Sequence, residues 1–342
     1  MRTHLRTALI LLLAAALLAW FLRDANLTAV WREIQRGHGG LLVAAMLATL
    51  TTYVLRALRW RYLLMPLGHP PFSLVLRTTV IGFAATSLLP ARAGEVVRPY
   101  LLARRAGLSA TATFATIIVE RFLDLITVLV LFSSYLLVFD PGMTGRDPAV
   151  FHALKIGGGA VGVAALVGLA IMMVAAGHPE RLASWALKVE RVLPASLAQA
   201  LAKLVRLFTT GLAVVRQPRR LLMASVLSLP LWLAIASGIW FTTLAFNIDM
   251  PFSGSFLMLA LLTVGVAVPT PGAVGAFHEA YRIGVTTFFG VPNDRAIGAA
   301  IVLHAVSFIL VAVVGIVLMA QDGLSLSRVS GLAASRPSEE QA

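Results

Sequence analysis

Long hydrophobic runs separated by short polar or basic segments dominate the chain. Eight strong runs lie at 8–22, 40–58, 72–89, 110–139, 153–176, 221–245, 252–268 and 296–320, and a weaker ninth lies at 276–290. About 20 mostly apolar residues are needed to cross the hydrocarbon core of a bilayer. The pattern therefore predicts an all-α, polytopic helical membrane protein.

Composition supports a membrane protein and excludes several other classes. The 342 residues are 59% hydrophobic and 13% charged, whereas soluble domains carry roughly 25% charged residues. Cysteine is absent, which excludes disulfides, thiolate metal sites and cysteine nucleophiles. The net charge of +13 indicates cytoplasmic loops beside anionic headgroups rather than nucleic-acid binding. We interpret the first run, after Arg2 and Arg6, as a retained helix and not a signal peptide, because so many runs follow.

Basic residues predict the orientation of the chain. They cluster at Arg2 and Arg6, at Arg56, Arg59 and Arg61, at Arg98, Arg104 and Arg105, along 181–220, and at Arg328 and Arg336. The positive-inside rule places these clusters and both termini on the cytoplasmic side. If every run crossed, two clusters would face opposite sides, so we expect 72–107 and 252–290 to form re-entrant helical hairpins. About six full spans and two hairpins result, or about eight spans if the hairpins cross.

The two predicted hairpins resemble each other in sequence. Each opens with a Pro-Phe-Ser triplet and has a Pro/Gly break after its first arm. The triplets are 71–73 and 251–253, and the breaks are 89–94 and 269–275. Hairpins that enter from opposite faces suggest an inverted-topology repeat with halves 40–139 and 221–320, an arrangement common in transporters.

Two segments are too polar to cross the membrane. The segment 180–216 mixes basic residues with tryptophan and leucine, and two interpretations stay open. It is either an amphipathic helix on the cytoplasmic leaflet or a solvated loop packed on its own protein. The composition of 325–342 predicts a disordered cytoplasmic tail, which leaves 1–324 as a single integral membrane domain.

Ionisable residues inside the hydrophobic runs are the candidates for chemistry, because each costs about 2.5–3.5 kcal/mol at membrane depth. The first group, Arg92, Glu95 and Arg98, surrounds Gly94 at a spacing of three, so Glu95 is expected to pair with Arg98. A helix beginning at Gly94 would direct its N–H groups toward an anion, and arginine adds a planar fork for phosphate. The alternative is a hairpin anchor near the headgroups.

The second group, Glu120, Arg121 and Asp124, lies within a hydrophobic run of nearly thirty residues. Glu120 and Asp124 are four apart and so share one helix face, and Arg121 can neutralise one of them. The group is either a structural ion pair between helices or the wall of a cavity.

The third group follows the second break and contains His278, Glu279 and Arg282, with His304 on the next run. A zinc-protease motif needs a second histidine four residues after the first, and that position is Arg282. His304 alone is equally consistent with a hydrogen-bonded interior histidine. We therefore predict no metal, no cofactor and no catalytic residues.

The charged motifs, taken in order, resemble a known family. The stretches are Ser87-Leu88-Leu89-Pro90-Ala91-Arg92-Ala93-Gly94-Glu95-Val96-Val97-Arg98-Pro99, Glu120-Arg121-Phe122-Leu123-Asp124, and Pro269-Thr270-Pro271-Gly272-Ala273-Val274-Gly275, with Arg56, Leu58, Arg59 and Trp60 before them. They are similar to the transmembrane region of lysylphosphatidylglycerol synthases and related flippase-like proteins. The pattern departs at Ala273, where glycine is frequent, and at His278, near a usual acidic position.

The resemblance implies a lipid flippase-like transporter. In two-domain members a separate cytoplasmic domain attaches the amino acid, and we expect this chain to lack that domain. By carry-over, and with the third group included, the candidate substrate-binding residues are Arg92, Gly94, Glu95, Arg98, Glu120, Arg121, Asp124, Pro271, Gly272, Gly275, His278, Glu279 and Arg282.

The predicted ligand is a phospholipid or other phosphate-bearing lipid of the cytoplasmic membrane, and an enzyme in or beside the membrane is an expected partner. Two alternatives stay open. One is a membrane-bound lipid-modifying enzyme with Glu95 or His278 as acid or base. The other is a non-transporting scaffold that recruits a partner through 180–216.

Overall fold

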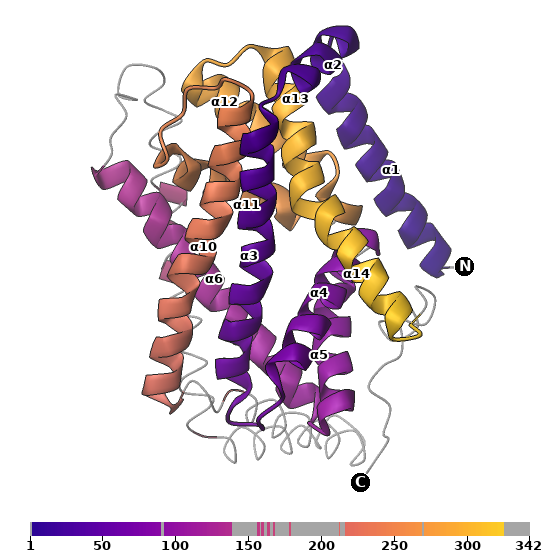
Figure 1. The fold of residues 1–342 in the computed structure, drawn as a ribbon, viewed down its shortest axis with the longest axis vertical. Helices are drawn as coiled ribbons and strands as arrows, with labels where there is room; N and C mark the ends of the chain where they lie inside the picture. Colours follow the sequence, from indigo (N-terminus) through magenta and orange to yellow (C-terminus); the bar gives the residue numbers. More distant parts are fainter. Residues whose placement is uncertain are drawn as a thin grey trace, which may run out of the picture.

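The computed structural model describes residues 2–89, 92–138, 217–268 and 270–324, with a few isolated positions between 139 and 216. The regular elements in these ranges are helices, arranged as a bundle (Figure 1). They are α1 (Arg2–Leu22), α2 (Leu27–Arg36), α3 (Gly39–Leu64), α4 (Phe72–Leu88), α5 (Gly94–Ala106), α6 (Ala110–Val138), α10 (Pro218–Ala245), α11 (Gly254–Ala267), the 3-10 helix η5 (Pro271–Ala273), α12 (Ala276–Phe289), α13 (Asn293–His304), the π-helix η6 (Ala305–Ile309) and α14 (Leu310–Gln321). The all-α prediction is confirmed for these residues.

Several helices have the length and hydrophobicity of membrane spans. Within the described ranges, α3, α10 and the continuous stretch Asn293–Gln321 qualify, and the α1–α2 pair, bent by 84°, would add a fourth span. Exposed side chains such as Leu47 and Val226 give the outer surface of the bundle the apolar character that lipid contact requires. A multi-pass membrane protein is therefore confirmed. The run 153–176 lies mostly outside the described residues, so the count of six spans stays a prediction.

Both predicted hairpins exist as helix–break–helix units. α4 packs against α5 and α11 packs against α12. In Figure 1 the first pair occupies the lower part of the molecule, whereas α12 lies near the top. The chain turns through residues with positive φ, at Arg92 (55°) in the first break and at Gly272 (58°), Ala273 (56°) and Gly275 (87°) in the second. Entry from opposite membrane faces and the inverted repeat stay predictions.

The tips of the two hairpins meet inside the bundle. A Cβ atom built on Gly94 would lie 1.9 Å from the carbonyl oxygen of Gly82, so only glycine lets α5 begin this close to α4. A Cβ atom built on Gly272 would lie 3.1 Å from the carbonyl oxygen of Ser87. The second break therefore contacts the C-terminal end of α4.

An ionic bridge ties the end of α14 to the first hairpin. Asp322, directly after α14, lies 2.7 Å from Arg77 Nη2 on α4 and 2.7 Å from Arg105 Nη1 on α5. Burial by itself would raise the pKa of the Asp322 carboxyl, but the hydrogen bonds and charges of the two arginines outweigh burial and hold this pKa below its usual value. The bridge thus favours the ionised carboxylate.

The division into a 1–324 domain with repeat halves and a 325–342 tail stays a prediction. The tail lies outside the described residues, as does the segment 180–216 apart from Leu212 and Arg216.

Candidate functional site

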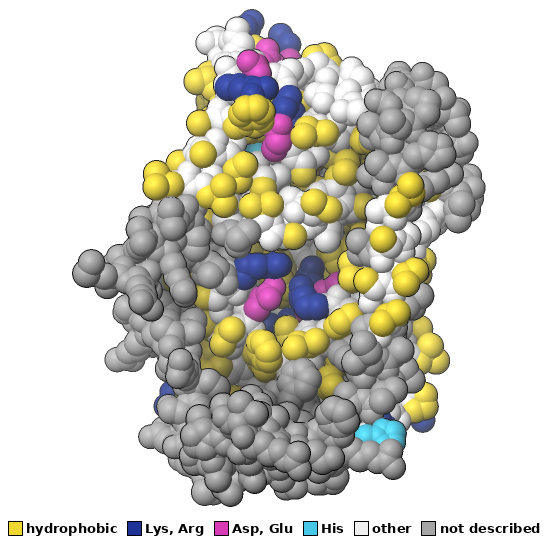
Figure 2. All heavy atoms as spheres, turned by 180° about the vertical axis from the view of Figure 1, so that it is seen from behind, with side chains coloured by type: hydrophobic (Ala, Val, Ile, Leu, Met, Phe, Trp, Pro, Cys, Tyr) yellow, Lys and Arg dark blue, Asp and Glu magenta, His cyan; other side chains and the backbone are white. Residues whose placement is uncertain are grey.

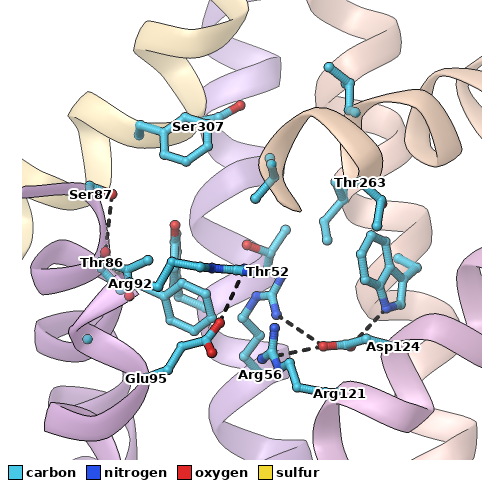
Figure 3. A pocket seen from close by; sticks show the side chains of 18 of the residues that line it. Thr52, Arg56, Thr86, Ser87, Arg92, Glu95, Arg121, Asp124, Thr263 and Ser307 are labelled. Atoms are coloured by element: carbon cyan, nitrogen blue, oxygen red, sulfur yellow. Dashed lines mark hydrogen bonds and ion pairs between the residues drawn. The ribbon is translucent and has the colours of Figure 1, made fainter. Parts of the chain in front are cut away.

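A cavity of about 420 Å³ lies where the hairpin tips face the long helices. Its wall is formed mainly by α3, α4, α5, α6, α10, α11 and η6, and the polar side chains labelled in Figure 3 lie around it. The charged residues that line it are Arg56, Arg92, Glu95, Arg98, Arg121 and Asp124. The rest of the wall is hydrophobic or carries hydroxyl groups.

Charged side chains of the cavity are accessible from outside the bundle. Arg92, Glu95 and Arg121 keep 37%, 34% and 35% of their side-chain surface exposed. Figure 2 shows basic and acidic side chains gathered at mid-height on one face and bordered by hydrophobic ones. A ligand can therefore reach polar groups from a hydrophobic side of the molecule.

A buried charge cluster forms one end of the site. It comprises Arg56, Arg59, Arg98, Glu120, Arg121 and Asp124. Glu120, which has no exposed surface, accepts hydrogen bonds from Arg98 Nη1 at 2.8 Å and from Arg121 Nη2 at 2.7 Å. Arg59 Nη2 lies 3.5 Å from the same carboxylate oxygen. One carboxylate thus joins arginines of α3, α5 and α6.

Asp124 is the second carboxylate of the buried charge cluster and lines the cavity. Its Oδ1 accepts hydrogen bonds from Arg59 Nη1 at 2.6 Å and from Trp232 Nε1 at 3.0 Å. Its Oδ2 lies 3.4 Å from Arg121 Nη2 and 4.0 Å from Arg56 Nη1. Trp232 belongs to α10, so Asp124 connects α6 to both α3 and α10.

The buried charge cluster carries a surplus of two positive charges, since four arginines face two carboxylates. Several of its buried atoms have no hydrogen-bond partner among the described residues: six arginine nitrogens (Arg56 Nη1, Arg59 Nε and Nη2, Arg98 Nε and Nη2, and Arg121 Nε) and two carboxylate oxygens (Glu120 Oε2 and Asp124 Oδ2). Buried donors without an acceptor are costly. Guanidinium groups match the oxygens of phosphate and carboxylate. The site is thus suited to an anion with several oxygen atoms.

Comparison with known proteins agrees with this architecture. The family described as "Lysylphosphatidylglycerol synthase TM region" matches residues 7–315. The chain belongs to this family. A curated relative, "Glycosyltransferase AglD" of Haloferax volcanii, is 25% identical over 324 residues, which cover 87% of this chain and 51% of that protein. The chain thus spans about half the length of that relative.

The predicted pairing of Glu95 with Arg98 is wrong. Glu95 Oε1 lies 3.2 Å from Arg92 Nη2, while Arg98 pairs with Glu120 across to α6. The Arg98 guanidinium also lies over the ring of Trp60, 3.9 Å from its centroid. Arg98 thus pairs with the Glu120 carboxylate and the Trp60 ring on neighbouring helices, and not with Glu95 three positions earlier on its own helix.

Arg59 and Arg98 do not lie in loops but in the helices α3 and α5, and the membrane side that they face stays a prediction. Both side chains are buried, at 0% and 3% exposure. They are stable there because Glu120 and Asp124 neutralise them. The spacing argument for Glu120 and Asp124 is confirmed, because both carboxylates reach Arg59 from one face of α6.

The structure brings together part of the predicted site. Arg92, Gly94, Glu95, Arg98, Arg121 and Asp124 line the cavity, and Glu120 lies behind its wall. Pro271, Gly272, Gly275, His278, Glu279 and Arg282 do not line it. Pro271 and Gly272 form η5, whose Gly272 contacts α4, and Gly275 precedes α12.

The histidines of the third group belong to the packing of the second hairpin tip. His278 stacks on His304 with ring centroids 4.4 Å apart, and the Gly275 N–H donates to His278 Nδ1 at 3.3 Å. His304 Nε2 lies 2.7 Å from the Gly272 carbonyl oxygen, so it is a hydrogen-bonded interior histidine. No cluster of three His, Cys, Asp or Glu residues that could hold a metal occurs in the described ranges.

Glu279 and Arg282 pair with each other away from the cavity, and Arg282 Nη1 also donates to Asn293 Oδ1 at 3.1 Å. This arrangement connects α12 to the start of α13. It gives both side chains protein partners, and their predicted role in substrate binding stays a prediction.

Several site residues were missed from the sequence. Arg56 and Arg59 are charges within or beside a hydrophobic run, the same signal that identified Glu120, and it would have found them. Trp232 and Ser307 carry no such signal, because each looks like an ordinary residue of a membrane helix.

Proposed function

We propose that this protein binds a phosphate-bearing lipid headgroup in the cavity and moves the lipid between the leaflets of the cytoplasmic membrane. The surplus positive charge and the unpartnered guanidinium N–H groups support this proposal above all. The headgroup would enter from the hydrophobic face shown in Figure 2 while the acyl chains stay in lipid. By the positive-inside rule we also propose that both termini are cytoplasmic.

The broken helices support movement as well as binding. Discontinuous helices whose breaks meet near the middle of a bundle are the parts that many transporters shift during alternating access. Here the second break, at Gly272, contacts Ser87 at the end of α4, directly before the first break and beside the cavity. The proposed inverted repeat would make outward and inward openings equivalent by symmetry.

The test is leaflet-resolved movement of fluorescent phospholipids in proteoliposomes. The variant is Arg56→Gln, because Arg56 lines the cavity and its Nη1 has no hydrogen-bond partner among the described residues. A charge-assisted hydrogen bond contributes about 1.5–3 kcal/mol, so translocation should fall about tenfold or more. Arg104→Gln, an exposed arginine on α5, removes the same charge elsewhere and should leave translocation unchanged. Movement no faster than in protein-free vesicles would refute the proposal.

The name of the relative, a glycosyltransferase, favours a second candidate function in which the chain takes part in modifying a lipid. We propose that the chemistry then resides in a partner enzyme, while this chain presents the lipid. Lipid species that appear in cells expressing only this chain, in a strain without such partners, would instead identify it as an enzyme.

A further inference from the structure

The short helix α2 has a hydrophobic face that the protein covers only in part. Val30 and Ile34 belong to this face and pack into the hydrophobic core. Leu27 and Trp31 extend the same face around the helix, because residues three and four positions apart are neighbours on a helix surface. Their side chains nevertheless remain open, since Leu27 is 64% and Trp31 60% exposed.

The other exposed side of α2 is polar and basic. It carries Thr28, Arg32 and Arg36. A helix with tryptophan and leucine on one side and arginines on the other has the pattern of an amphipathic helix that lies in the interface of a membrane. The position of α2 in the fold agrees with this pattern.

The chain connections of α2 place it where candidate membrane spans end. α1 ends at Leu22, four residues before α2 begins at Leu27, and α3 begins at Gly39, directly after α2. Between α2 and α3, the His38 N–H donates to the carbonyl oxygen of Ala245, the last residue of α10, at 2.9 Å. One end of α1, of α3 and of α10 therefore lies beside α2.

Side chains also bind α2 to the start of another span. Arg295 Nε, in the first turn of α13, lies 3.2 Å from Glu33 Oε2. The N–H of Asn26, the N-cap of α2, donates to Asp294 Oδ1 at 3.1 Å. The stretch Asn293–Gln321 has the length and hydrophobicity of a span, so its N-terminal end lies at the level of α2, at the top of the molecule in Figure 1.

The direction of α2 fits the surface of a bilayer and not a crossing. α2 is bent by 84° from α1, so it runs close to the membrane plane when α1 crosses the membrane. The outer side of α1 exposes Leu12, Leu13 and Trp20, and the Arg23 guanidinium lies 3.5 Å from the centroid of the Trp20 ring. Tryptophan and arginine are typical of the level at which a span leaves the hydrocarbon. The exposed face of α2 thus continues the lipid-facing side of α1.

We propose that α2 is a membrane-surface helix that inserts Leu27 and Trp31 between lipid headgroups and the upper acyl chains, while Arg32 and Arg36 face the lipid phosphates and water. Its partner is the lipid surface and not a second protein. Through the pair of Glu33 and Arg295, α2 holds the start of α13 at the membrane boundary. This surface is separate from the cavity and binds lipid whether or not the cavity transports it.

The experiment uses single cysteines, which the chain itself lacks. Leu27→Cys and Trp31→Cys are compared with Thr28→Cys and Arg32→Cys, the next positions along the chain. Each is labelled with a nitroxide in the full chain, in nanodiscs of phosphatidylethanolamine and phosphatidylglycerol. Electron paramagnetic resonance measures the access of the label to oxygen, which concentrates in lipid, and to a nickel chelate, which stays in water.

The labels at 27 and 31 should favour oxygen over the chelate severalfold more than the labels at 28 and 32, because successive residues of a helix point about 100° apart. Equal access to the chelate at all four positions would place both sides of α2 in water and overturn the proposal. Labels at 27 and 31 that are shielded from both reagents would show that protein covers them, such as a second copy of the chain, and would also overturn it.

Trp31→Phe gives a second measurement that needs no label. Subtracting the tryptophan fluorescence of this variant from that of the wild type isolates the emission of Trp31. Phospholipids brominated high on their acyl chains should quench this emission more strongly than phospholipids brominated near the chain ends, because an interfacial helix inserts only to the boundary of headgroups and acyl chains. Emission that is the same in brominated and unbrominated lipid would contradict the insertion of Trp31.

Discussion

Neutralising Glu120 should destabilise the fold far more than neutralising an exposed glutamate. Its carboxylate accepts hydrogen bonds from Arg98 and Arg121 and lies 3.5 Å from Arg59, and it has no exposed surface. Glu120→Gln keeps the shape of the side chain but leaves the four arginines of the cluster, of which Arg59 and Arg98 are buried, with one carboxylate. Removing one partner of a buried ion pair costs about 3–5 kcal/mol, because the remaining charge stays buried without compensation.

Glu95→Gln is the matched control for this prediction. Glu95 also pairs with an arginine, Arg92 at 3.2 Å, but both side chains are about one-third exposed. Solvent screens such a pair, so its loss should cost about 0–1 kcal/mol. The two variants make the same chemical change, and the expected difference of at least about 2 kcal/mol in the free energy of unfolding depends on burial alone.

The assay is equilibrium unfolding in mixed micelles with a denaturing detergent, followed by tryptophan fluorescence. Adding Arg98→Gln to the Glu120→Gln variant removes one surplus charge, so the double variant should lose less stability than the sum of the two single losses. If Glu120→Gln is no less stable than Glu95→Gln, the buried charge cluster does not contribute as described, and the reasoning from its geometry fails.

Two further predictions concern the first hairpin. Gly94→Ala places a Cβ atom 1.9 Å from the Gly82 carbonyl oxygen, which should lower the free energy of unfolding by about 3 kcal/mol or more. The measurement is the yield of monodisperse protein, and Gly40→Ala, in open space, should leave that yield unchanged. Equal yields of the two variants would contradict this prediction. The folded state lowers the Asp322 pKa below 3.8, so its bridge stabilises the protein above that pH and is lost as the pH falls. The melting temperature of Asp322→Asn should therefore lie below wild type at pH 7 and converge with it in acid; a constant gap would refute the bridge.

Local sequence patterns predicted the helices closely. The run 110–139 corresponds to α6 (Ala110–Val138), and the weak run 276–290 corresponds to α12 (Ala276–Phe289). Hydrophobic length and Pro/Gly breaks are properties of neighbouring residues, and these decide where a helix begins and ends. The first run, 8–22, marks only the hydrophobic part of α1, which begins at Arg2.

The sequence predicted only those features of the site that depend on spacing within one helix. Glu120 and Asp124 share a face because they belong to one helix, and the structure confirms this spacing argument. The pairing of Glu95 with Arg98 failed because spacing along one helix says nothing about competitors on other helices. The true partner of Asp124 is Arg59, 65 residues away.

The sequence alone determined that this protein lies in a membrane, that it is all-helical and that it contains two broken helical hairpins. It also identified charged residues, which are tolerated inside a membrane only when they have partners. Only the tertiary structure decided which charges pair, that two positive charges are left over, and that hydroxyls of distant helices line the same cavity. The physical reason is that hydrophobic burial and helix formation depend on adjacent residues, whereas charge compensation depends on which helices pack side by side.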